Sequence, residues 1–173
     1  MTRRVVVTGM AGITALGERW PAIEAALRRG TNGVRRMSEW ARYESLHTRL
    51  GAPVDDFKAP AHYPRKQIRS MGRVALLAVR ATEMALEEAG LHDDASVRDG
   101  RMGVAYGSSA GSVAPVQVFG NMLATGSMEG VTSTSYIQMM PRIHTGAVIW
   151  NSGTPIFLPI RSFGLVMPDF ALT

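Results

Sequence analysis

The side chains that could act as nucleophiles in this 173-residue sequence are hydroxyls, because the sequence contains no cysteine. Ser109 lies between Gly107 and Gly111, which is the spacing of the G-x-S-x-G turn that exposes a hydrolase serine. That chemistry also needs an acid followed by a histidine later in the chain. The candidates that we considered, His144 and Asp169, come in the reverse order. We therefore favour an ordinary glycine-rich turn over a serine hydrolase site.

Metal and nucleotide chemistry are also disfavoured by the spacing of the residues. The absence of cysteine excludes disulfides and thiolate metal sites. The glycine patterns at 8–17 and 106–112 match neither the dinucleotide-binding fingerprint nor the phosphate-binding loop, and strand-to-helix turns use glycine in any α/β fold. No metal site is predicted, because no usual ligand spacing joins the four histidines, which are His47, His62, His92 and His144.

The basic residues at the start of the predicted helix over 65–91 are the strongest charge feature, in a sequence with a formal net charge of +5. They recur at helical spacing and would form a face that is either simply solvated or able to bind an acidic partner. Aromatic residues are not interleaved with them, so nucleic acid is not an expected partner. The residues are Arg65, Lys66, Arg69 and Arg73.

The sequence shows neither a signal-peptide core nor a run of about 18 apolar residues, so we expect a cytoplasmic protein that does not cross a membrane.

Alternating strands and helices must position the candidate residues. The β-branched run at 5–8 predicts a strand buried on both faces, as in parallel sheets. The predicted order gives a layered α/β domain. Its elements are a strand at 5–8, a helix within 19–30, an irregular insertion at 31–64, a helix over 65–91, a strand at 102–106 and a helix within 113–126.

Several segments, in this order and spacing, resemble the N-terminal half of β-ketoacyl-acyl-carrier-protein synthases, most closely the elongating type II bacterial enzymes. The segments are 3–17, 52–57, 65–91, 101–112 and 136–141. The resemblance implies a thiolase-like layered α/β fold, present here as an incomplete N-terminal half with a mixed or parallel sheet. It also implies the family reaction, a decarboxylative Claisen condensation of an acyl chain with a malonyl carrier in fatty-acid or polyketide chain elongation.

The resemblance also assigns expected roles to the basic residues. Lys66 and Arg69 match the basic helix start that docks the acidic acyl carrier protein, which favours the acidic-partner interpretation of this face. No cofactor is expected, because the phosphopantetheine group arrives on the carrier. The intact family members are expected to be homodimers.

Five further residues are expected to form the acyl pocket or the dimer interface. Ser108 and Ala110 lie in the strand–turn that flanks the acyl pocket in the family. Tyr136, Met139 and Met140 lie in the turn that contributes to the pocket and to the dimer interface. The alternative for these last three residues is an ordinary core role.

The sequence departs from the family pattern in two places. The family's Met-Asp-Arg appears as Met71-Gly72-Arg73, which loses a carboxylate. The nucleophilic cysteine should fall at 164–167, where the sequence has Gly-Leu-Val-Met, and the family's catalytic histidines belong to a second half. We therefore expect no catalytic residue in this chain and no activity of the chain alone.

The sequence after Pro141 loses the family pattern. We interpret residues 1–141 as the N-terminal part of a β-ketoacyl synthase domain and residues 142–173 as a divergent tail, with a disrupted reading frame as one hypothesis for it. The alternative function is a non-catalytic relative of the condensing enzymes that binds a carrier or a partner subunit. Chain-length-factor subunits usually have glutamine in place of the cysteine, and no glutamine occurs at 164–167.

Overall fold

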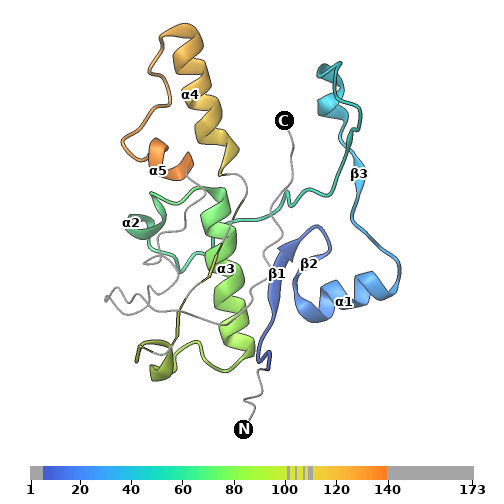
Figure 1. Cartoon of the computed structure of the whole chain (residues 1–173), viewed down its shortest axis with the longest axis vertical. Helices are drawn as coiled ribbons and strands as arrows, with labels where there is room; N and C mark the ends of the chain where they lie inside the picture. The colour runs from blue at the N-terminus through green and yellow to red at the C-terminus, as the bar shows by residue number, and fades with distance from the viewer. Residues whose placement is uncertain (1–5, 101, 104, 107, 109–110, 140–173) are drawn as a thin grey trace.

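The computed structural model describes residues 6–100, 102, 103, 105, 106, 108 and 111–139. Helix α3 (Arg73–Glu88) is the longest described element, and the others are arranged around it (Figure 1). The strand β1 (Ala11–Thr14) runs beside the C-terminal half of α3, and the helix α4 (Val113–Thr125) lies beyond its N-terminal end. The two ends of α3 therefore have different neighbouring elements, which are α4 at the N-terminal end and β1 at the C-terminal half.

The core of the described residues forms between α3 and β1. The buried side chains of α3 recur every three or four residues, as expected for one face of a helix. Val54 and Phe57 pack against the edge of this core from the loop that precedes α2 (Arg65–Ile68). The core cluster consists of Ile13, Leu77, Ala81 and Met84. Of the apolar residues whose spacing predicted the helix over 65–91, Met84 lies in this core, whereas Leu76 and Val79 are only half-buried.

A hairpin and a helix follow β1 without a long connection. Strand β2 (Gly17–Arg19) pairs antiparallel with β1, and α1 (Trp20–Arg28) begins at the next residue. A proline in the first turn suits the start of α1, because a helix leaves its first N–H groups without partners. Gly30, with φ of +75°, ends the helix in the left-handed region. The helix predicted within 19–30 is confirmed, as is α4 within 113–126.

The predicted insertion at 31–64 contains short regular elements. Strands β3 (Arg35–Arg36) and β4 (Leu50–Gly51) pair antiparallel and enclose the 3₁₀ helix η1 (Ser38–Arg42). Further along the chain, the 3₁₀ helix η2 (Ala95–Val97) and the helix α5 (Ser135–Met139) complete the described elements.

The strand predictions are wrong for the described residues. Residues 6–8 form no strand, and the side chains of Val6 and Val7 are 65% and 69% exposed. The described residues at 102, 103, 105 and 106 are not in a strand either. A buried strand needs hydrogen-bonded neighbours, and the described residues pair in two antiparallel two-stranded sheets, β1–β2 and β3–β4. The mixed or parallel sheet is therefore not confirmed within the described part of the chain.

Candidate functional site

The predicted helix over 65–91 is interrupted between α2 and α3. Gly72 is the N-cap residue of α3 and has no side chain with which to cap the helix. The hydroxyl Oγ of Ser112 performs this role, because it accepts a hydrogen bond from the backbone N–H of Val74 at 3.2 Å. Ser112 is buried and lies immediately before α4. A residue 38 positions away therefore provides the helix cap.

The same contact explains the carboxylate that the family pattern loses. A Cβ atom on Gly72 would lie 2.2 Å from Ser112 Oγ and 2.4 Å from the backbone oxygen of Gln138. An aspartate at position 72 would need both neighbouring segments to move. Ser112 Oγ thus occupies the space that a side chain at the N-cap would take and makes the hydrogen bond that such a side chain would make.

A second hydrogen bond joins helix α5 to the same junction. The side-chain Nε2 of Gln138 donates to the backbone oxygen of Arg69 at 2.8 Å. The segment between α2 and α3 is therefore connected to the start of α4 by Ser112 and to α5 by Gln138. We call residues 69–74, Ser112 and Gln138 the junction.

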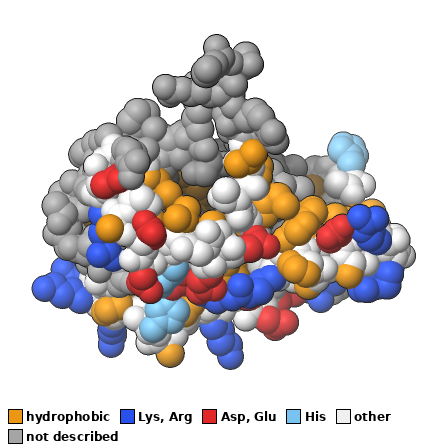
Figure 2. Space-filling model, turned by 90° about the horizontal axis from the view of Figure 1, so that it is seen from below, with side chains coloured by type: hydrophobic (Ala, Val, Ile, Leu, Met, Phe, Trp, Pro, Cys, Tyr) orange, Lys and Arg blue, Asp and Glu red, His pale blue; other side chains and the backbone are white. Residues whose placement is uncertain are grey.

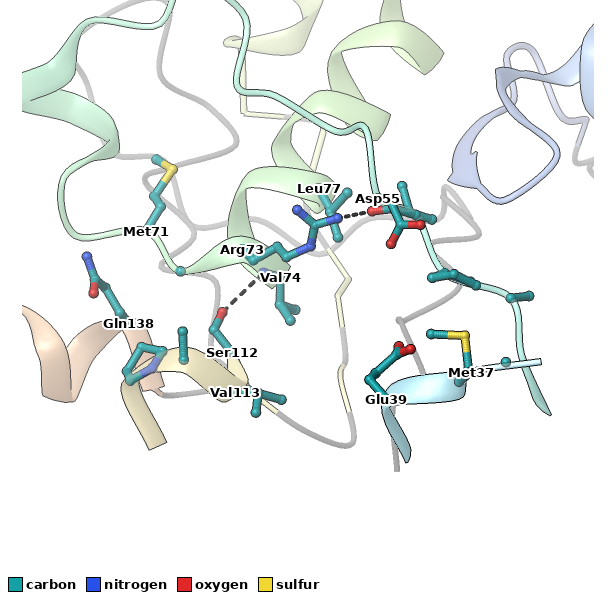
Figure 3. A pocket seen from close by; sticks show the side chains of 18 of the residues that line it. Met37, Glu39, Asp55, Met71, Arg73, Val74, Leu77, Ser112, Val113 and Gln138 are labelled. Atoms are coloured by element: carbon teal, nitrogen blue, oxygen red, sulfur yellow. Dashed lines mark hydrogen bonds between the residues drawn. The ribbon is translucent and has the colours of Figure 1, made fainter. Parts of the chain in front are cut away.

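A cavity of about 590 Å³ lies beside the junction. Met71, Val74 and Leu77 form one wall, and Met37 and Trp40 from the β3–β4 hairpin form another. Figure 3 shows side chains of both walls and the hydrogen bond between Val74 and Ser112. The lining is largely apolar, which suits an aliphatic ligand group or an apolar side chain from another part of a larger protein.

Two of the charged residues that line the cavity, Arg73 and Asp55, are engaged with other parts of the protein. The guanidinium of Arg73 donates to the backbone oxygen of Val54 and lies over the ring of Phe57, 5.8 Å from its centroid. Asp55 is paired with Arg35. These contacts hold the loop that leads to α2 against the start of α3.

The predicted docking cations lie on and next to α2, and Arg69 is also the first residue of the junction. Arg65, Lys66 and Arg69 are exposed. Among the residues that the structure describes, none of these three side chains forms an ion pair with an acidic residue. They therefore form a positive patch, which we call the cationic patch, available to an acidic partner.

The predicted pocket residues are only partly described. Tyr136 is 54% exposed on α5, which argues against an ordinary core role for it, and Met139 is half-buried. Ser108 is also half-buried, but it does not line the cavity described above. Ala110, Met140 and the divergent tail at 142–173 lie outside the described residues, as do Ser109, His144 and positions 164–167.

Sequence reasoning missed Ser112 and Gln138. The signal that could have found Ser112 was the missing carboxylate at Gly72, because a helix start without a capping side chain needs another acceptor. Which residue supplies that acceptor depends on a contact between distant segments, so the sequence pattern alone could not name it.

A separate polar cluster lies around Glu83 in the C-terminal half of α3. Figure 2 shows acidic and basic side chains interspersed on the face of the molecule that is seen from below. The Glu83 carboxylate accepts hydrogen bonds from Tyr63 at 2.7 Å and Arg80 at 2.6 Å, and contacts His62 Nε2 at 2.7 Å. Burial alone would raise the pKa of Glu83, but these hydrogen bonds outweigh it and hold the pKa below its ordinary value. Burial and the bond to Glu83 raise the pKa of Tyr63.

Two of the four histidines, His62 and His92, lie near a carboxylate of this cluster. Ligand atoms of Glu83, Glu87 and His92 lie within 4.8 Å of one another. Arg80 contacts both carboxylates, and Arg19 pairs with Glu87 at 2.8 Å. These two guanidinium groups neutralise the acidic side chains, so we assign the cluster to holding α3 in place and not to a metal.

Comparison with known proteins places this chain in a family. A model described as "Beta-ketoacyl synthase, N-terminal domain" matches residues 2–149. The chain belongs to this family, as the sequence resemblance predicted. No helix of the described residues is long and apolar enough to cross a membrane.

Individual relatives agree with this assignment. The chain is 37% identical over 95 residues to "Nodulation protein E" of Rhizobium leguminosarum bv. trifolii, covering 54% of this chain and 23% of the relative. It is 25% identical over 151 residues to "3-oxoacyl-[acyl-carrier-protein] synthase 2" of Staphylococcus aureus strain COL, covering 87% of this chain and 36% of the relative. The chain therefore spans about a third or less of the length of these curated relatives.

The structure resembles solved condensing enzymes. A β-ketoacyl synthase from Burkholderia phymatum STM815 is 62% identical, with a TM-score of 0.73, covering 86% of this chain and 36% of that one. "The ishigamide ketosynthase/chain length factor" is 28% identical, with a TM-score of 0.62, covering 80% and 34%. The predicted fold class is confirmed at the level of the ketosynthase, or thiolase-like, fold.

Proposed function

We propose that this chain provides the carrier-docking and pocket-forming N-terminal part of a β-ketoacyl-acyl-carrier-protein synthase for fatty-acid or polyketide chain elongation. The observation that carries the proposal is the cationic patch, whose three exposed cations adjoin the junction in a chain of this family. The alternative, a non-catalytic relative of the condensing enzymes, is not favoured by relatives that include 3-oxoacyl-carrier-protein synthases.

The chain alone would bind and would not condense. The family reaction needs a cysteine nucleophile, and this sequence has none. Acyl transfer to the chain is therefore not expected, and the phosphopantetheine group would arrive on the carrier. In an intact synthase, a homodimer would form around the pocket residues of α5 and its neighbours.

Reversing the charge of the cationic patch should weaken binding of an acyl carrier protein. The double variant Lys66→Glu/Arg69→Glu should raise the dissociation constant for the carrier on the order of tenfold at low salt, because two charges that attract the acidic carrier become repulsive. The effect stays moderate because exposed charges are screened. Isothermal titration calorimetry at two salt concentrations measures this effect. The affinity of the unchanged chain should itself fall as salt rises.

Arg29→Glu is the matched control for this experiment. Arg29 is also exposed, but it follows α1, which lies apart from α2 in Figure 1. This variant should bind the carrier almost as well as the unchanged chain. Because the control reverses one charge and the double variant reverses two, a control loss equal to that of the single variant Lys66→Glu would show a general charge effect and would contradict docking at the cationic patch.

A further inference from the structure

We propose that Ser112 and Gln138 are positioning residues that couple carrier docking to acyl binding. They hold the residues around Arg69 and the start of α3 against α5 and the start of α4. Binding of the carrier at the cationic patch then favours binding of its acyl chain, and the reverse. This proposal rests on the proposed function above and adds a mechanism by which that site discriminates an acylated carrier from an unloaded one.

The first connection runs through Ser112. Its Oγ accepts from Val74 N–H at 3.2 Å and fixes the start of α3 to the residue before α4. Ser112 follows the glycine-rich turn that contains Ser108, which the family resemblance places beside the acyl pocket. A displacement of Ser112 therefore changes the cap of α3, and a displacement of the start of α3 changes the position of Ser112.

The second connection runs through Arg69. Its side chain belongs to the cationic patch, and its backbone oxygen accepts a hydrogen bond from Gln138 at 2.8 Å. Gln138 stands between Tyr136 and Met139 in α5, the two described residues that the resemblance assigns to the pocket or the dimer interface. One hydrogen bond thus separates a docking residue from the pocket helix.

The packing at Gly72 makes this connection stiff. An added Cβ at Gly72 would lie 2.4 Å from the backbone oxygen of Gln138 and 2.8 Å from Cβ of Ser112. The three segments therefore meet without space for even one methyl group. Closely packed segments of this kind transmit a displacement instead of absorbing it.

Coupling of this kind has a reciprocal consequence. If acyl binding orders the pocket side, it must strengthen carrier binding by the same factor with which the docked carrier strengthens acyl binding. We expect an acylated carrier to bind about fivefold or more tightly than the same carrier with an unloaded phosphopantetheine group, the lower end of typical couplings.

The test compares the dissociation constants of these two carriers for the unchanged chain and three variants. Ser112→Ala and Gln138→Met should lower the ratio between the carriers while leaving the affinity for the unloaded carrier nearly unchanged. Gln117→Leu, an exposed change on α4, should keep the ratio. Gln138→Met keeps approximately the size of the half-buried side chain, removes its donor and adds no charge beside Arg69, so it remains informative if Ser112→Ala impairs folding.

The outcomes are distinct. A retained ratio in both junction variants, or an equal loss of affinity for both carriers, would overturn the coupling. Binding of both carriers by the unchanged chain with equal affinity would overturn the coupling and leave the docking proposal standing. Absence of any salt-sensitive carrier binding would overturn the proposed function, and the coupling with it.

Discussion

At the scale of single residues, Gly72 and Ser112 act as a matched pair. The absent side chain of one makes room for the hydroxyl of the other, and this hydroxyl caps α3. What looked in the sequence like a lost carboxylate is a different arrangement of the same helix start. A departure from a family pattern can therefore be compensated by a residue far away in the sequence.

This pairing predicts non-additive stabilities. Ser112→Gly should lower the free energy of unfolding by about 1 kcal/mol, because the α3 cap is lost. Gly72→Asp should lower it by about 1–3 kcal/mol, because the new side chain collides with Ser112 and with a backbone oxygen. In the double variant the aspartate can take over the cap, so its loss should be smaller than the sum of the two single losses. Urea unfolding followed by circular dichroism measures all four free energies, and strict additivity would contradict the pairing.

At the scale of elements, α3 is held at both ends by different chemistry. Its N-terminal end is held by the junction, and its C-terminal half is held by apolar contact with β1 and by the cluster around Glu83. Glu83 has only 13% of its side chain exposed and contacts the loop before α2 through His62 and Tyr63. The cluster therefore fixes the loop that leads into the cationic patch.

The cluster predicts a loss of stability in acid. The pKa of Glu83 is lowered in the folded state, so its ionised form contributes stability that is present above the ordinary pKa of 4.5 and is lost as the pH falls towards the lower folded value. Glu83→Gln should lower the free energy of unfolding by about 1–2 kcal/mol at pH 7 and flatten its fall below pH 4.5. Glu44→Gln, at an exposed position, is the control and should leave the pH profile unchanged. If the free energy of unfolding of the Glu83→Gln variant falls below pH 4.5 as steeply as that of the unchanged chain, the loss of stability in acid is due to other groups.

Features that depend on residues close together in the sequence were predicted well, and features that depend on distant contacts were not. The existence of α3 follows from spacing within one helix, so helical periodicity was sufficient to predict it. Its buried face was found only in part, because Met84 lies in the core whereas Leu76 and Val79, which also carried the pattern, are half-buried. The strand at residues 6–8 was predicted wrongly because strand formation depends on neighbours distant in the sequence. The cationic patch was visible in the sequence as helical spacing, whereas the junction required contacts across 38 and 69 residues.

At the scale of the whole molecule, apolar surface is left uncovered on α4. The helix is apolar on several sides, and Pro115 is its single buried residue. Leu123 is 81% exposed, and Val113 and Val116 are also exposed. Apolar surface of this extent usually marks an interface, which agrees with the homodimer proposed for the intact synthase.

This surface predicts self-association of the chain. Sedimentation velocity should show a sedimentation coefficient that rises with protein concentration, and Leu123→Glu should raise the dissociation constant of the assembly by about tenfold or more, because burial of a leucine contributes about 1.5–3 kcal/mol. Leu50→Glu replaces an equally apolar, exposed residue on β4 and should have a smaller effect. A chain that stays monomeric at all concentrations would contradict this assignment of the α4 surface.

The contact between β1 and α3 also sets a delay during protein synthesis. Ile13 finds its core partners Leu77 and Met84 far along the chain, so about 70 residues must be added before the core can close. At ribosomal rates of about 5–20 residues per second, this takes roughly 4–14 s. Throughout that interval the β1–β2 hairpin has its apolar side uncovered, and the exposed Val6 and Val7 precede it. The apolar side of the hairpin thus stays exposed to other apolar segments until the core closes.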